Sequence, residues 1–97
     1  MPKRYGIQLI ADPKSKEVAK YGKLAVAVLN AGDGLGLVFQ CVHEGATRTE
    51  GGILFMRLDI ICADNDRKRP VYRVEMYQID ENIRVTSYTK KAAHFPF

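Results

Sequence analysis

Cysteine and histidine are the residues of this chain best suited to metal binding or nucleophilic catalysis, and they are few. Cys41 and His43 are two positions apart, so they would share a face of a strand. Cys62 and His94 complete the set. A structural zinc site normally has tightly spaced ligand pairs on both sides, and a Cys–His dyad needs a third group that orients the base. Neither condition is met, so the sequence predicts no metal site, no cofactor and no enzymatic activity.

Two further segments resemble ligand-binding loops without completing the pattern. Residues 32–36 carry three glycines spaced as in a phosphate-binding loop, but residues 37–39 are typical of a strand where the fingerprint needs a helix. Residues 64–66 begin like a calcium loop, but Lys68 and Arg69 stand where an EF-hand has an oxygen ligand and a glycine. We interpret the first segment as a hairpin turn and the second as part of a charged loop.

The distribution of charge is the most informative feature of the sequence. Residues 1–23 and 67–97 each have a net charge of +4, whereas residues 24–66 have a net charge of −4. If the first and last strands lie close together, the basic ends form one positive face. Such a face with interleaved aromatic residues is typical of a nucleic-acid binder.

We therefore predict a small non-enzymatic module that contacts nucleic acid, either DNA or RNA and more specifically its single-stranded form. The predicted contact residues are Lys14, Lys16, Lys20, Tyr21, Lys23, Arg67, Lys68, Arg69, Tyr72, Arg73, Tyr77, Arg84, Tyr88, Lys90 and Lys91. A net charge of +4 is also within the range that keeps small domains soluble, and tyrosines on strands are often half-buried. Tyr72 and Tyr88 in particular can face the core.

The alternative hypothesis is a structural or protein-interaction domain. In that case an exposed sheet edge, or the C-terminal Phe95, Pro96 and Phe97, docks on a partner or on a second copy of the chain, which makes a homo-oligomer. Two exposed phenylalanines are costly to leave in water, so we predict that this tail is docked.

Alternating apolar and polar residues predict most of the fold. Period-two patterns indicate strands over residues 4–11, 35–43, 53–63, 71–79 and 83–89. Short spacings between them favour antiparallel pairing. The expected fold is mainly β, or α+β with one helix between residues 14 and 31. It is a small antiparallel barrel or curled sheet of five or six strands, and an OB-like strand order is preferred.

Residues 14–31 fit two descriptions. Ser15 is suited to cap a helix, and apolar residues follow at helical spacing. Gly22 would cost about 1 kcal/mol inside a helix, and residues 24–29 also read as a strand. The prediction is a short helical turn over residues 15–21 and then a strand over 23–30, with a single helix over 16–30 as the alternative.

The same patterns predict turns and faces. Asp33-Gly34 suits a hairpin, residues 44–52 form a polar loop, and residues 80–82 form a turn. Leu37, Phe39 and Cys41 are expected on one face of their strand. On the strand over 53–63, one face is the core and the face with Arg57 and Asp59 is expected to be wet in its middle. A symmetric hairpin about the loop would set Cys41 near Phe55, so both cysteines are predicted to be free and at least partly buried.

Residues 7–13 and 21–30 resemble the opening of bacterial single-stranded DNA-binding proteins. In that family a strand, an Asp-Pro turn and a glycine precede an alternating Ala/Val strand, and the tail ends in Pro-Phe, as Pro96-Phe97 does here. The resemblance implies an OB-fold and single-strand binding by aromatic stacking. The segment that carries the resemblance, residues 7–30, is about a quarter of the chain. The chain has no tryptophan, and its tail is basic where the family's is acidic.

The size and composition of the chain predict one domain over residues 1–97, with a C-terminal tail over 90–97. No signal peptide or membrane-spanning run is expected, because the longest apolar stretch, residues 24–29, is far shorter than a span requires. Two cysteines fit a reducing compartment, so the predicted location is the cytoplasm.

Overall fold

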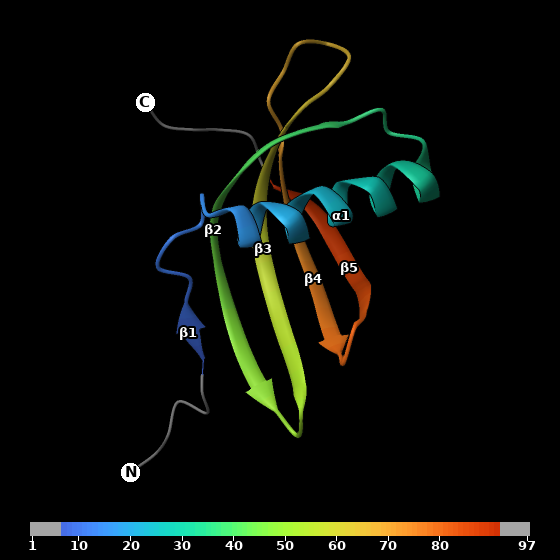
Figure 1. Ribbon diagram of the computed structural model, residues 1–97. Coiled ribbons are helices and arrows are strands. Elements are labelled where there is room, and N and C mark those ends of the chain that lie inside the picture. The colour runs from blue at the N-terminus through green and yellow to red at the C-terminus, as the bar shows by residue number, and fades with distance from the viewer. Residues whose placement is uncertain (1–6, 92–97) are drawn as a thin grey trace.

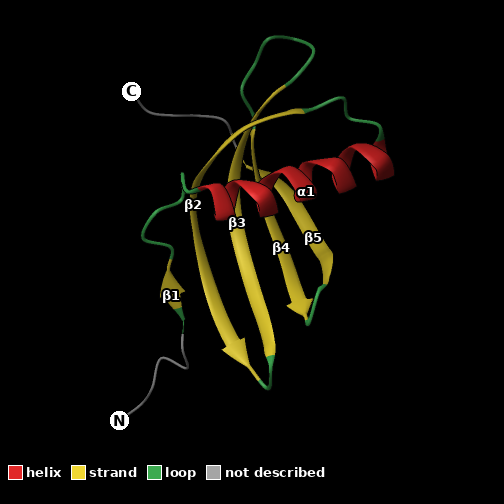
Figure 2. Cartoon of the chain, viewed as in Figure 1, coloured by secondary structure: helices red, strands yellow, loops and turns green. Residues whose placement is uncertain are grey.

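The computed structural model describes residues 7–91, which form one antiparallel sheet with a single helix across one face (Figures 1 and 2). The strands pair in chain order, β1-β2-β3-β4-β5, and every pairing is antiparallel. The elements are β1 (Gln8–Leu9), α1 (Lys16–Asp33), β2 (Val38–Glu50), β3 (Ile53–Ala63), β4 (Val71–Ile79) and β5 (Asn82–Lys91).

The fold class predicted from the sequence is confirmed: the described chain is mainly β with one helix, Lys16–Asp33, which ends two residues after the predicted range of 14–31. Of the two forms expected for the sheet, the structure has the curled sheet. The first and last strands are not joined, so the closed barrel of an OB-fold is not formed.

The preferred strand over residues 23–30 is wrong, and the alternative of one continuous helix is correct. The Ser15 side chain accepts a hydrogen bond from the Val18 N–H at 3.2 Å and caps the start of α1. Gly34 ends the helix in the left-handed conformation, with φ 61°, and its N–H donates to the Asn30 carbonyl. Asp33-Gly34 is therefore a helix end and not a hairpin.

A close approach of α1 to the sheet explains why a glycine lies in the middle of the helix. A Cβ at Gly22 would lie 2.5 Å from Cε1 of Phe39 and 3.0 Å from Cγ2 of Val42, both on β2. The helix loses propensity at Gly22 but gains contact with the sheet. Gly22, which lowers the helix propensity of the sequence, is thus the residue that lets the helix pack closely on β2.

Strand β2 is longer than predicted and contains most of the expected polar loop. It continues to Glu50, and the turn to β3 is only Gly51 and Gly52, whose φ values are 59° and 81°. Exposed polar residues are tolerated in the 44–50 segment because one side of this sheet meets solvent. The prediction of a loop over residues 44–52 is wrong, because most of these polar residues belong to a strand with one side in solvent.

Two register shifts in β2 change the faces expected for its residues. They lie between Phe39 and Cys41 and between Val42 and Glu44. Phe39 pairs with Cys62, but Cys41 pairs with Ile61, so Cys41 does not share the face of Phe39. Arg48, and not Cys41, pairs with Phe55.

Both cysteines are free, Cys62 is buried and Cys41 is half-buried, as predicted. Their separation has a different cause from the one expected. They lie on adjacent strands one residue out of register, and their side chains belong to opposite faces of the sheet. Burial raises the pKa of the Cys62 thiol to about 11.

We call the side of the sheet that packs against α1 the covered face and the opposite side the open face. The covered face supplies the core together with Ala25, Val26 and Leu29 of the helix. Its fully buried residues include Leu58, Ile60 and Val74. The covered-face core residues of the strands are Val42, Met56, Leu58, Ile60, Cys62, Tyr72, Val74 and Met76.

The open face carries the residues that alternate with the core positions, and within residues 7–91 no helix lies on it. Arg57 is exposed there, as expected. Asp59 is not solvent-exposed as predicted, because only 3% of its surface is accessible. Two cations hold its carboxylate, as described below.

Candidate nucleic-acid interface

Four residues form a row across the open face, one from each of strands β2 to β5. Arg48 pairs with Phe55, Phe55 with Tyr77, and Tyr77 with Arg84. We call these four residues the aromatic row. The Arg48 guanidinium lies 4.6 Å from the centroid of the Phe55 ring, and the centroids of the Phe55 and Tyr77 rings are 6.3 Å apart. The row therefore has two contacting rings in its centre and a cation at each end.

The local sequence explains this placement. Aromatic residues suit the half-buried positions of a pleated sheet, and both Phe55 and Tyr77 are half-buried on the two central strands. The Gly51-Gly52 turn fixes the register of its hairpin by setting Glu50 opposite Ile53. Two residues further along each strand, Arg48 lies opposite Phe55.

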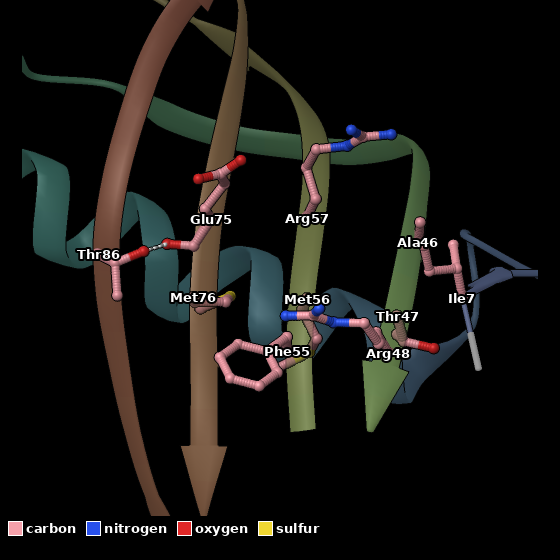
Figure 3. Close-up of a pocket in the computed structure, with 10 residues that line it drawn as sticks. All are labelled: Ile7, Ala46, Thr47, Arg48, Phe55, Met56, Arg57, Glu75, Met76 and Thr86. Atoms are coloured by element: carbon pink, nitrogen blue, oxygen red, sulfur yellow. Dashed lines mark hydrogen bonds between the residues drawn. The ribbon is translucent and has the colours of Figure 1, made fainter. Parts of the chain in front are cut away.

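A pocket of about 360 Å³ adjoins the aromatic row (Figure 3). In the close-up the Arg48 guanidinium lies beside the Phe55 ring, and Arg57 and Glu75 project from the neighbouring level of β3 and β4. The Thr86 hydroxyl donates to the Glu75 carbonyl at 3.1 Å. The lining residues are Ile7, Ala46, Thr47, Arg48, Phe55, Met56, Arg57, Glu75, Met76 and Thr86. The pocket thus offers apolar area, two arginines and one carboxylate.

A cluster of three charges lies further along the open face. The Asp59 carboxylate accepts two hydrogen bonds from Arg73, at 2.8 and 3.1 Å, and one from Lys91 at 3.3 Å. Burial raises the pKa of Asp59, but the hydrogen bonds and charges of Arg73 and Lys91 outweigh burial and lower it overall. The hydrogen bond to Asp59 raises the pKa of Arg73 in turn. Both cations are therefore engaged within the protein.

Of the residues predicted to bind nucleic acid, the structure places Arg73, Tyr77, Arg84 and Lys91 on the open face. Tyr77 and Arg84 belong to the aromatic row. Arg73 and Lys91 belong to the Asp59 cluster.

The lysines predicted in the first third of the chain lie in the helical layer instead. Lys14 precedes α1, and Lys16, Lys20 and Lys23 are exposed on it. Tyr21 also belongs to α1, and its hydroxyl donates to the Gln78 side chain at 2.8 Å. These residues are separated from the open face by the thickness of the sheet.

Tyr72 and Tyr88 are on the covered face, where the sequence allowed them to be. Tyr72 is 7% exposed, and burial raises its pKa, with smaller contributions from the charges of Cys62, Asp64 and Asp33. Tyr88 packs on it, with ring centroids 6.2 Å apart, and is 36% exposed. Tyr88 and Tyr77 therefore lie on opposite sides of the sheet.

The remaining predicted cations gather at one end of the sheet, in the β3–β4 loop and at the end of β5. Lys91 pairs with Val71, which follows the loop directly, so the two segments are neighbours. Asp64 shapes the loop: its Oδ1 accepts from the N–H groups of Asp66 and Lys68, both at 2.9 Å. We call Arg67, Lys68, Arg69, Lys90 and Lys91 the loop-end cations; the first four are exposed.

Sequence reasoning missed Arg48, Phe55 and Arg57 as candidates. Arg48 falls in the segment that the sequence predicts to be a loop, and Phe55 is not among the predicted contact residues. A signal was present, because Gly-Gly flanked by alternating residues is a two-residue hairpin turn, and that turn puts Arg48 opposite Phe55.

The described residues also contain no cluster suited to metal binding. Among residues 7–91 no three His, Cys, Asp or Glu side chains are grouped so as to hold a metal ion. Cys41 is half-buried and His43 is exposed. His94, Phe95, Pro96 and Phe97 lie outside the described residues.

Comparison with known proteins adds no function: no family model matches the chain, and no curated protein is significantly similar to it. In the part of the chain that the structure describes, α1 is not apolar enough to cross a membrane.

Proposed function

We propose that the protein is a non-enzymatic module that binds single-stranded nucleic acid on the open face of its sheet. The aromatic row is the observation that carries this proposal. Base-on-aromatic stacking contributes about 1–3 kcal/mol per base, and it is tolerant of sequence because every base has a π face. Phe55 and Tyr77 offer two such rings on adjacent strands.

A single strand fits this site better than a duplex. Bases must be unstacked from their partners before they can lie on protein rings. Neighbouring strands are about 4.8 Å apart, so the row from β2 to β5 spans about 14 Å. That length accommodates bases on the central rings with phosphates beside Arg48 and Arg84 at the ends.

The loop-end cations extend the proposed path. Tyr77 and Val71 are separated by six residues of β4, or about 20 Å at 3.3 Å per residue. Phosphates further along the same strand would then meet Arg67, Lys68 and Arg69. Binding to phosphates carries no base information, so sequence preference should be weak.

The decisive experiment measures the anisotropy of fluorescent oligothymidylate and oligouridylate at several salt concentrations. Binding should fall steeply with salt because each neutralised phosphate releases counterions. The double variant Phe55→Leu/Tyr77→Leu should weaken binding at least tenfold. Tyr88→Leu is the matched control on the opposite side of the sheet, and its affinity should match that of the unmodified protein.

Two results would contradict the proposal. One is the absence of binding at about 50 mM salt, where phosphate contacts are strong. The other is equal loss of affinity in the Tyr88 control and the aromatic-row variant, which would place the contacts elsewhere. Charge reversal of Arg67, Lys68 and Arg69 should weaken binding to all sequences alike.

We also propose a cytoplasmic location, because two free cysteines fit a reducing compartment.

The second candidate function is protein interaction or self-association. Its specific support is strand β5, which is the last strand of the sheet and has no partner on its outer side among the described residues. The C-terminal Phe-Pro-Phe segment, the other feature behind that hypothesis, lies outside the described residues.

A further inference from the structure

The outer edge of β5 is the longest unpaired strand edge in residues 7–91. At the opposite side of the sheet, β1 is only two residues long, whereas β5 spans Asn82–Lys91 (Figure 1). Seven of its ten residues are exposed and the other three are half-buried, with no neighbouring strand beyond them in the described residues. Every second residue of an edge strand directs its N–H and C=O away from its one partner. This edge is therefore a template for a further strand.

The charge of β5 is one-sided. Arg84, Lys90 and Lys91 are its charged residues, and it contains no Asp or Glu. The β3–β4 loop adds Arg67, Lys68 and Arg69 at the end where β5 finishes. A strand that added to this edge would run alongside cations at both of its ends.

A second copy of β5 is a poor partner for this edge. In any register of two β5 strands, no residue can meet an opposite charge, and antiparallel registers centred near Ser87 set Arg84 against Lys90 or Lys91. The register shift between β4 and β5 beside Glu75 also bends the strand, which opposes the pairing of long flat edges. These features disfavour self-association but leave the edge open to a shorter strand of another protein.

We propose that the β5 edge binds an extended acidic segment of another protein, which adds to the sheet as a sixth strand. Backbone hydrogen bonds supply general affinity, and acidic side chains opposite Arg84 and Lys90 select the partner. This surface is distinct from the aromatic row except for Arg84, so the proposal does not depend on nucleic-acid binding.

The test uses the full chain and three synthetic peptides with blocked ends. The first carries adjacent pairs of glutamates between pairs of valines, so that acids lie on both faces of the added strand, as Arg84 and Lys90 do on β5. The second has lysines at the glutamate positions, and the third is the glutamate peptide with alternate backbone nitrogens methylated. The glutamate peptide should bind and should slow hydrogen exchange at outward-facing amides of β5. The methylated peptide keeps its charge but cannot donate along one edge, so it should bind at least tenfold more weakly.

Protein variants locate the site. Arg84→Glu/Lys90→Glu should weaken binding of the glutamate peptide about tenfold, because each cross-strand charge pair becomes repulsive. Lys16→Glu/Lys23→Glu changes the net charge equally on α1 and should leave binding unchanged. Phe55→Leu/Tyr77→Leu should also leave it unchanged, which separates this edge from the open face.

Three outcomes would overturn the proposal. Equal binding of the methylated and unmethylated peptides would show charge attraction without strand pairing. Equal binding of the lysine peptide would remove the selection for acidic segments. A dimer by sedimentation in which the outward-facing amides of β5 exchange slowly, while the peptides fail to bind, would make a second copy the occupant.

Discussion

The two faces of the sheet differ in what their side chains contribute. On β3 the residues alternate: Leu58 and Ile60 are fully buried beneath α1, whereas Phe55 and Arg57 on the other side are in contact with solvent. Asp59 is the exception on the open face, buried with its charge held by two cations. The covered face therefore holds the fold together by apolar burial, and the open face carries rings and charges that the core does not require.

Core truncation should show the largest difference between the faces. Leu58→Ala should destabilise the protein by about 2–5 kcal/mol, because it opens a cavity beneath α1. Phe55→Ala on the same strand should cost less, since the ring is half-buried and water can fill the space. Urea denaturation measures both. A larger loss at Phe55 than at Leu58 would contradict the division of roles between the faces.

The Asp59 cluster should make the second largest contribution. Asp59→Asn should lower stability by about 1–3 kcal/mol at neutral pH, because the charge-assisted hydrogen bonds from Arg73 and Lys91 are lost. Those cations are partly exposed, so solvent offsets part of the loss.

The same cluster predicts the pH dependence. Because the pKa of Asp59 is lowered in the folded protein, its contribution is present above the unfolded pKa of about 4 and is lost as the pH falls through the folded value. Unfolding curves between neutral and acidic pH should therefore converge for Asp59→Asn and the unmodified protein. If the gap between the two stays constant down to low pH, the carboxylate charge is not its source.

The approach of α1 to the sheet should give a smaller effect. Gly22→Ala should destabilise by about 1 kcal/mol, since the added Cβ displaces Phe39 and this overpacking exceeds the gain in helix propensity. In Gly22→Ala/Phe39→Leu the two changes should compensate in part, as a double-mutant cycle would measure. Strictly additive effects would mean that the Phe39 ring does not limit the space at Gly22.

The reactivity of the two cysteines compares the open and covered faces without a change in sequence. A thiol reagent at pH 8 should modify Cys41, which is half-buried on the open side, and spare Cys62, whose pKa of about 11 keeps it protonated in the core. Cys62 should react only when urea unfolds the protein. Mass spectrometry of digested, labelled protein distinguishes the two sites, and rapid labelling of Cys62 in the native protein would contradict its burial.

The strands over 53–63 and 71–79 were predicted with their observed bounds, because period-two alternation reports directly on a sheet with one wet side. The helix was not preferred, since Gly22 reads as a helix breaker unless its contact with Phe39 is known. That contact joins α1 to β2 and cannot be inferred from local propensity.

The candidate site was predicted in part. Tyr77 and Arg84 were named, but Tyr72 and Tyr88 were grouped with them, and the structure sets these on the opposite side of the sheet. Tyr72 is five residues before Tyr77 on β4, so alternation alone sets the two rings on opposite faces. For Tyr88 the cause is a register shift between β4 and β5: Tyr88 pairs with Val74, whereas Val85, three residues earlier, pairs with Met76 on the same face. One extra residue in a strand changes the face of all that follows, and its position is not evident from the alternation of apolar residues alone.

The pairing of strands in chain order has a consequence for how the molecule folds. Each hairpin from β2 to β5 closes through a turn or a short loop, so these strands pair through contacts between residues that are close in sequence, which form quickly. Strand β1 is different, because Gln8 and Leu9 reach β2 only after the whole of α1 has been placed between them. The N-terminal strand should therefore join last and open first, and its two residues should exchange their amide hydrogens through local unfolding while the hairpins remain closed.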